Sequence, residues 1–158
     1  MNKFKILSLL LLLSTLCFSQ KKKEIKKAGI KSISVTETHG NKTITDSKIF
    51  YDSNGNILEE INYDKEGALK STTKFKYNSS GDIIEETEYD DKNTLKEKRL
   101  TKYNNLGEKV EELILDKDNK QLKKNIITYD SKGFKTERKT FDANNVLVST
   151  KKYSYSFK

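Results

Sequence analysis

The sequence predicts an all-β fold, an antiparallel meander of about ten strands in one strongly curled sheet, with a partly closed barrel as the alternative form. Two observations lead to this prediction. A short unit with a turn signal recurs eight times from residue 51 onward, and self-similarity of this kind defines an architecture. The chain also contains no proline, a residue that would remove backbone donors from the ladder of a sheet.

The repeat has two alternating lengths. Its units begin with an aromatic residue or leucine, and successive openings are 12 and then 14 residues apart, so the full period is a 26-residue pair. The openings are Tyr51, Tyr63, Tyr77, Tyr89, Tyr103, Leu115, Tyr129 and Phe141. Each opening is expected to end one strand and to begin the turn that leads to the next.

Turn chemistry explains two further positions of the unit. The second residue is always Asp or Asn, whose side chain can accept hydrogen bonds from backbone N–H groups two residues on. The fifth residue is always Gly or Asn, which tolerate a positive φ, as a three-residue hairpin loop requires. The predicted structural turn positions are therefore Gly55, Gly67, Gly81, Asn93, Gly107, Asn119, Gly133 and Asn145.

The N-terminal residues predict export. Residues 1–19 have the features of a signal peptide, because Lys3 and Lys5 precede an apolar run that ends near small residues. Cleavage before Gln20 is expected, and a lipid anchor at Cys17 is the alternative. Residues 20–30 are predicted to be a basic tether, and residues 31–158 to form the repeat domain. Loss of the leader would lower the net charge from +8 to +6.

Strict alternation of side chains, as in a regular strand, would place almost every aromatic residue on one core face. One glutamate of each 12-residue unit falls on the same face, where a buried carboxylate needs a donor. The register expected from three-residue loops pairs these inward polar residues as Glu59 with Thr73, Glu85 with Arg99, Glu111 with Asn125, and Glu137 with Lys151. The row is interpreted as a polar stripe satisfied within the sheet; a ligand-binding row is the alternative.

Three segments, YDSNGNILEE, YNSSGDIIEE and YDSKGFKTER, resemble YD repeats, the units of RHS-type bacterial proteins. The resemblance covers about residues 51–155. In large RHS proteins such repeats build a curled β-sheet shell around a toxin domain. The resemblance therefore implies a bacterial secreted protein with a curled sheet. Eight units are too few to enclose another protein, so a short, stand-alone version is expected.

No pattern in the sequence predicts catalysis. His39 is the one histidine and lies beside a turn glycine, so neither a catalytic nor a metal site is expected, and no cofactor is expected.

The leading hypothesis is a non-enzymatic, secreted or periplasmic module that binds a protein or polysaccharide of the envelope, or has a structural role at the cell surface. The alternatives are a carrier of an apolar ligand inside the curl and an accessory protein of a secreted RHS-type toxin system. Neither nucleic-acid binding nor a membrane span is expected, because basic residues are interleaved with Glu and the apolar run near the N-terminus is short.

Overall fold

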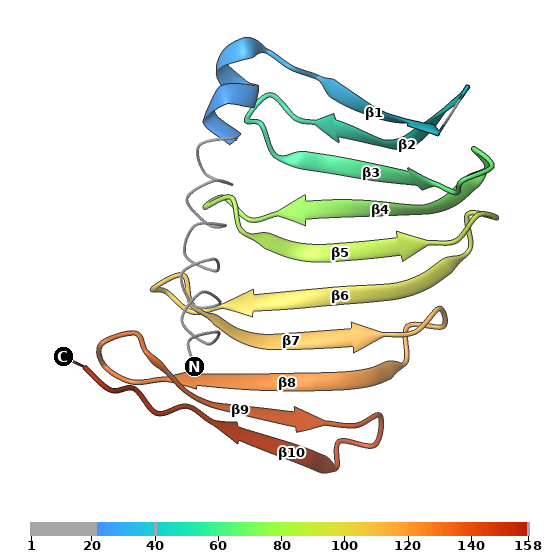
Figure 1. The fold of residues 1–158 in the computed structure, drawn as a ribbon. Helices are drawn as coiled ribbons and strands as arrows, with labels where there is room; N and C mark the ends of the chain where they lie inside the picture. The colour runs from blue at the N-terminus through green and yellow to red at the C-terminus, as the bar shows by residue number, and fades with distance from the viewer. Residues whose placement is uncertain (1–21, 40, 158) are drawn as a thin grey trace, which may run out of the picture.

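The computed structural model describes residues 22–39 and 41–157. The predicted signal peptide, its cleavage site and Cys17 lie outside the described residues. Residues 22–28 form a short helix, and ten strands follow it (Figure 1). The strands are β1 (Ser32–His39), β2 (Lys42–Tyr51), β3 (Ile57–Tyr63), β4 (Leu69–Tyr77), β5 (Ile83–Tyr89), β6 (Leu95–Tyr103), β7 (Lys109–Leu115), β8 (Gln121–Tyr129), β9 (Lys135–Phe141) and β10 (Leu147–Lys152).

All ten strands belong to one antiparallel sheet, and each strand pairs only with its neighbours in sequence. The predicted all-β meander is therefore confirmed. The sheet twists but stays open, because β1 and β10 lie at its two edges and do not pair with each other among the described residues (Figure 1). The short helix lies beside the end of the strands at which β2 ends and β3 begins.

The eight turns have the conformation that their residues predict. Every predicted turn position has a positive φ, between 59° and 61° at the three asparagines and between 77° and 89° at the five glycines. In the turn after β2, the Oδ1 atom of Asp52 accepts hydrogen bonds of 2.8 Å from the backbone N–H groups of Asn54 and Asn56. Local chemistry thus fixes where each strand ends.

Each hairpin also contains a β-bulge that was not predicted. At the β5–β6 hairpin Tyr89 faces Leu95, as expected, but Glu88 then faces Glu97, so Lys96 is an extra residue on β6. The same irregularity recurs at the start of every strand from β3 to β10. A bulge shifts all later pairs by one residue, and it reverses the faces to which the following side chains point.

The bulges make the predicted inward pairs wrong by one residue. Each residue that was predicted to face a glutamate instead faces the residue that follows this glutamate in the sequence: Thr73 faces Glu60, Arg99 faces Glu86, Asn125 faces Glu112, and Lys151 faces Arg138. The glutamates predicted for the core face pair elsewhere: Glu59 faces Lys74, Glu85 faces Leu100, Glu111 faces Ile126, and Glu137 faces Lys152.

The register defines two faces of the sheet. We call the face that carries Glu60, Glu86 and Glu112 the helix-side face, because the helix residue Ile25 lies near Glu60 and its partner Ile49. The face that carries the preceding glutamate of each unit is the opposite face. The prediction of one aromatic face is wrong, since Tyr77 lies on the helix-side face and Tyr89 on the opposite face. The bulges cause this division.

A single layer has little interior. The buried apolar residues of the described chain are Ile25 and Ile127, and Asn125 is the one side chain that is fully buried there. Tyrosines on the helix-side face tie adjacent strands together, because each hydroxyl donates to a carbonyl 20 residues earlier in the chain. The bonds run from Tyr77 to Ile57, from Tyr103 to Ile83, from Tyr129 to Lys109, and from Tyr155 to Lys135.

Candidate functional site: a basic cleft beside the helix

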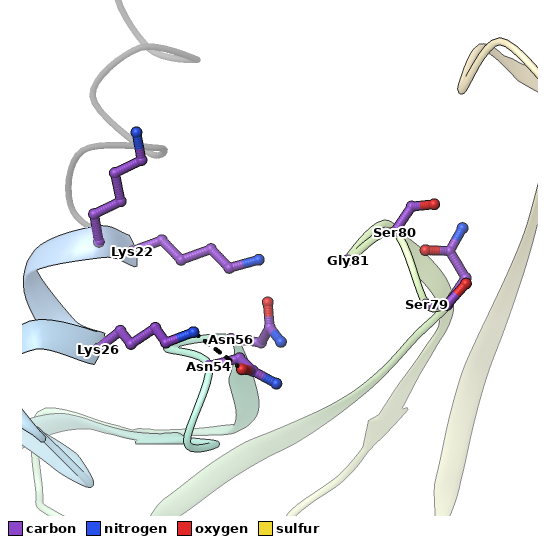
Figure 2. Close-up of a pocket in the computed structure, with 9 residues that line it drawn as sticks. Lys22, Lys26, Asn54, Asn56, Ser79, Ser80 and Gly81 are labelled. Atoms are coloured by element: carbon purple, nitrogen blue, oxygen red, sulfur yellow. Dashed lines mark hydrogen bonds between the residues drawn. The ribbon is translucent and has the colours of Figure 1, made fainter.

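A cleft of about 500 Å³ opens between the helix and two turns that lie at the same end of the strands (Figure 2). The turns follow β2 and β4, so they lie two strands apart, about 9–10 Å from the inter-strand spacing. The residues that line the cleft are Lys22, Lys23, Lys26, Asn54, Asn56, Asn78, Ser79, Ser80 and Gly81. Ammonium, amide and hydroxyl groups therefore dominate its wall.

The helix is held at this position by a close contact with one glycine. A side chain at Gly55 would place its Cβ atom 2.6 Å from the carbonyl oxygen of Lys22 and 3.3 Å from the backbone nitrogen of Lys26. Ile25, only 5% exposed, lies over a small cavity of about 210 Å³ that Ile49 and Tyr51 also line. These contacts fix the helix against the sheet.

The helix ends at a glycine cap. Gly29 has a φ of 65° and donates to the carbonyl of Lys26, and Ile30 donates to the carbonyl of Ile25. This pair of bonds is a Schellman motif. The tether predicted for residues 20–30 is thus partly a capped helix that packs on the domain. A glycine after KKEIKKA signals a helix end, but one large apolar residue in that segment gives no periodicity.

The lysines of the helix extend into the cleft. Figure 2 shows Lys22 and Lys26 reaching from the helix toward the turn that carries Ser79, Ser80 and Gly81. A Cβ atom at Gly81 would lie 3.1 Å from the Nζ atom of Lys22, and the Nζ atom of Lys26 is 3.4 Å from the Oδ1 atom of Asn54. The positive charges in the cleft therefore come from the helix side.

The nearby carboxylates are engaged in their own turns. The Asn56 amide donates to Asp52 at 2.8 Å, and the Asn78 amide donates to Asp82 at 3.1 Å. Burial alone would raise the pKa of Asp52, but hydrogen bonds from Asn56 and Asn54 and the charge of Lys22 hold that pKa below its ordinary value. These carboxylates accept hydrogen bonds within their own turns, and Asp52 also feels the charge of Lys22.

The groups in the cleft suit binding of an anion. Lysine ammonium groups act as point charges, and serine hydroxyls and asparagine amides add donors that can orient a carboxylate, sulfate or phosphate group. Among the described residues that line the cleft there is no carboxylate, histidine or cysteine. The wall therefore offers charge and hydrogen bonds to a ligand rather than a general base or a nucleophile.

A second polar cluster lies in the middle of the helix-side face. Its centre is Glu112, whose side chain is 16% exposed. The carboxylate lies 2.8 Å from Asn125 Nδ2, 3.3 Å from Lys109 Nζ, 3.9 Å from Arg138 Nη2 and 4.0 Å from Arg99 Nε. Burial opposes ionisation, yet the Asn125 bond and the charges of Lys109 and Arg99 hold the pKa of Glu112 below its ordinary value.

This cluster has a structural arrangement. Thr140 donates to the Oδ1 atom of Asn125 at 2.9 Å, so Asn125 links β7, β8 and β9 by hydrogen bonds to Glu112 and Thr140. Three strands are thereby held in register through one buried amide. The predicted polar stripe within the sheet exists in this form, with Glu112 in place of Glu111. The residue type was predicted, and the bulge decides which glutamate takes the position.

Comparisons with known proteins assign no family. No protein-family model matches the chain, and no curated protein matches its sequence. Similar solved structures include a Bacteroides fragilis protein of unknown function, with 14% identity over 80% of this chain and 95% of that one, at a TM-score of 0.43. A porin-like protein from Bacteroides uniformis is also 14% identical, over 80% of this chain and 51% of that chain, at a TM-score of 0.41. Likeness at this level carries no functional argument.

Within residues 22–39 and 41–157, no helix has the length and apolar character that crossing a membrane requires. In the same part of the chain, no three side chains of His, Cys, Asp or Glu come together as a metal site would need.

Proposed function

We propose that this protein is a non-enzymatic binding module of the bacterial envelope that holds an anionic polysaccharide in the basic cleft. The observation that carries the proposal is the wall of the cleft, where three lysines and five amide or hydroxyl side chains converge across about 500 Å³ (Figure 2). A polymer with one acidic group per sugar can bring a carboxylate to the lysines and hydroxyl groups to the amides.

Export to the envelope is part of this proposal and rests on the predicted signal peptide. Cell fractionation should find the protein outside the cytoplasm, and sequencing of its N-terminus should begin at or near Gln20. A chain that retains Met1 in the cytoplasm contradicts export. A lipid on Cys17 instead of a free Gln20 would place the cleft at a membrane surface and leave its ligand chemistry unchanged.

The alternative of a carrier for an apolar ligand has less support. A carrier needs an enclosed apolar cavity, whereas the sheet is open, and the two hollows beside Ile25, of about 210 Å³ and about 520 Å³, are each lined in part by charged side chains. A role beside a secreted toxin would follow from the resemblance to YD repeats, and the cleft neither favours nor opposes that role.

Titration with polygalacturonate, an acidic polysaccharide probe, tests the proposal by calorimetry. The variant with both Lys22→Gln and Lys26→Gln should bind at least tenfold more weakly than the native protein. The matched control carries Lys92→Gln and Lys117→Gln, which remove two exposed lysines from turns at the opposite end of the strands. The control should change the affinity less than twofold.

Two further results decide the matter. Binding should weaken as salt is added, because exposed charges are screened, and neutral dextran should not bind. Equal losses in the cleft variant and in the control variant would show that net charge, rather than the cleft, attracts the polymer. That result would overturn the proposed site.

A further inference from the structure

Three aromatic side chains form an exposed cluster beside the turn between β8 and β9. The ring centroid of Phe134 lies 5.1 Å from that of Tyr155 and 5.4 Å from that of Phe157. We call these three residues the aromatic cluster. Tyr155 is 47% exposed and Phe157 is 72% exposed, so packing on Phe134 leaves much of both side chains open to a ligand. Rings that pack on one another in this way present apolar surface in a defined orientation.

The segment that carries two of these rings is fastened to β9. The Tyr155 hydroxyl donates to the carbonyl of Lys135 at 2.9 Å, and the Tyr153 N–H donates to the carbonyl of Thr136 at 3.0 Å. The ring of Tyr153 lies 5.4 Å from the Nζ atom of Lys135. The aromatic cluster is therefore a fixed part of the domain, and it has a lysine beside it.

The repeat places the aromatic cluster at the same end of the strands as the basic cleft. Phe134 is the sixth residue of its unit, and Asn56, which lines the cleft, is the sixth residue of another. The N–H groups of Asn56 and Phe134 donate to the Oδ1 atom of the aspartate in their own turn, at 2.8 Å and 2.9 Å. Figure 1 shows the turns after β2, β4, β6 and β8 in a row at one end of the strands, with the segment after β10 beside the last of them.

The distance between the two sites sets the size of a ligand that could reach both. The turn of the aromatic cluster lies four strands from the nearer turn of the cleft, about 19 Å at the inter-strand spacing. The turn between them carries Leu106, which is 83% exposed, and Asn105, which is also exposed. The row thus presents ammonium, amide and apolar groups in sequence over a length that several sugars of an extended chain can span and a single sugar cannot.

A sugar ring has the chemistry that exposed aromatic rings bind. One face of a pyranose consists largely of C–H groups, which pack on the electron-rich face of an aromatic ring, while the hydroxyl groups at its rim stay in water. An acidic polysaccharide can therefore direct its carboxylates to Lys22 and Lys26 in the cleft and its ring faces to Tyr155 and Phe157.

We propose that the aromatic cluster is a second subsite for the polysaccharide held in the basic cleft, and that the chain runs along the row of turns between them. This inference rests on the proposed function and adds to it the length of the ligand, an extended oligosaccharide rather than one or two sugars. Two subsites that engage the same chain strengthen binding, because the second contact is intramolecular once the first has formed.

One carboxylate on this path opposes an anionic chain. Glu108 accepts a hydrogen bond of 2.7 Å from the Asn104 amide, and its Oε1 atom lies 3.1 Å from the place that a Cβ atom would take at Gly133. It therefore lies between the middle turn and the turn of the aromatic cluster, where it repels a passing carboxylate. Glu108→Gln keeps an acceptor for Asn104 and removes the charge, so it should strengthen binding of a long acidic chain.

Calorimetric titration with galacturonate oligosaccharides of two lengths tests the inference. A decasaccharide can reach both subsites, whereas a disaccharide can reach only one, and its charge favours the cleft. Phe157→Ala should weaken binding of the decasaccharide about fivefold and leave that of the disaccharide unchanged. Phe157→Tyr keeps a ring and should bind as the native protein does. The matched control is Val146→Ala, which trims a 57% exposed side chain at the sixth position of a turn at the opposite end of the strands and should change neither affinity.

The cleft variant separates this inference from the proposed function. If Lys22→Gln with Lys26→Gln abolishes binding while Phe157→Ala binds the decasaccharide as tightly as the native protein, the cleft is the whole site and this inference is overturned alone. Equal affinity of the native protein for the two lengths would overturn it in the same way. If the lysine variant binds both oligosaccharides normally, or if the native protein binds neither, the proposed function fails and the second subsite fails with it.

Discussion

Glu111 and Glu112 are neighbours in sequence, yet their side chains lie on different faces of the sheet. Glu111 lies on the opposite face and pairs with Lys102 at 2.8 Å, a lysine whose side chain is 72% exposed. Glu112 lies on the helix-side face, where Asn125, Lys109 and two arginines surround it. Repeated Lys–Glu pairs in water cover one face, and a half-buried network together with the helix covers the other.

The two sides of this single-layer sheet are therefore not equivalent. Exposed ion pairs contribute little because solvent screens them and long side chains lose entropy on pairing. A network with a fully buried amide contributes more, since each of its donors would be left unpaired if the acceptor were lost. We therefore expect substitutions on the helix-side face to cost more than matching substitutions on the opposite face.

The largest effect is expected at the centre of the network. Glu112→Leu removes the acceptor of the buried Asn125 amide and the counter-charge of Arg99 and Arg138, whose Nε atoms are buried without hydrogen-bond partners. We expect the free energy of unfolding to fall by about 2–3 kcal/mol, measured by chemical denaturation. Glu111→Leu is the matched control and should cost less than about 1 kcal/mol. Equal costs would contradict the contrast between the faces.

The same glutamate should confer acid sensitivity. The pKa of Glu112 in the folded protein lies below its ordinary value of 4.5. Its contribution to stability is therefore complete above pH 4.5 and is lost as the pH falls through the lower folded pKa. The Glu112→Gln protein lacks this contribution, so its stability should change less between pH 5 and pH 3 than that of the native protein.

The next effect concerns the turn beneath the helix. Gly55 and Gly107 have nearly the same φ, 77° and 78°, and asparagine occupies this position in three other turns. A Cβ atom at Gly107 meets nothing within 4 Å, but one at Gly55 meets the helix backbone at 2.6 Å. Gly55→Asn should cost about 1–3 kcal/mol through this overlap, and Gly107→Asn well under 1 kcal/mol. If thermal unfolding gives the two variants the same loss, the helix does not pack on this turn.

A smaller effect is expected for tyrosines on the two faces. The hydroxyl of Tyr77 donates to Ile57 at 2.8 Å, whereas that of Tyr89 makes no such bond to the described residues, and its ring lies 5.5 Å from the Nζ atom of Lys74. Tyr77→Phe should cost about 0.5–1.5 kcal/mol, and Tyr89→Phe less than about 0.5 kcal/mol. Denaturation of both variants at neutral pH measures the difference.

Stability at alkaline pH gives a second test of Tyr77. Burial raises the pKa of Tyr77 to about 12 and the charge of Asp52 adds to the effect, although the bond to Ile57 opposes it. The folded protein holds this proton above pH 10, where the unfolded chain releases it. Stability is therefore complete below pH 10 and declines between pH 10 and about pH 12. Tyr77→Phe should reduce that decline, and an unchanged decline would exclude Tyr77 as a source of it.

The sequence predicts the fold because its turn signals are local. An Asx residue at the second position and Gly or Asn at the fifth determine each reversal, so both the strand number and the strand ends can be predicted. The bulge cannot, because the extra residue has no common chemistry: it is Leu58, Lys70, Ile84, Lys96, Val110, Leu122, Thr136 or Val148.

The candidate site was harder to predict than the fold. Asn54, Asn56 and Ser79 each fit a turn, and a turn signal does not predict a shared cleft. They come together only because turns 26 residues apart lie at the same end of the strands. The lysines of the helix were recognised as a basic segment, but a single buried residue, Ile25, holds that segment on the domain. Contacts of this kind depend on distant residues, which no local pattern encodes.

The smallest effect tests the register itself. Regular strands would place Glu85 opposite Arg99, but the bulge places Glu86 there and puts Glu85 on the other face, 2.9 Å from Lys76. Double-mutant cycles with alanine should therefore give a coupling energy of about 0.2–1 kcal/mol for Lys76 with Glu85. That coupling should weaken in high salt, because the lysine side chain is 69% exposed.

The cycle for Glu85 with Arg99 should instead be additive within about 0.3–0.5 kcal/mol, since the two side chains lie on opposite faces. The Glu86 and Arg99 cycle is the matched positive control, because their atoms approach to 3.7 Å. A coupling between Glu85 and Arg99 larger than the other two would mean that the strands pair without a bulge. In that case Glu111, rather than Glu112, would occupy the centre of the network, and the predicted contrast between these two glutamates would reverse.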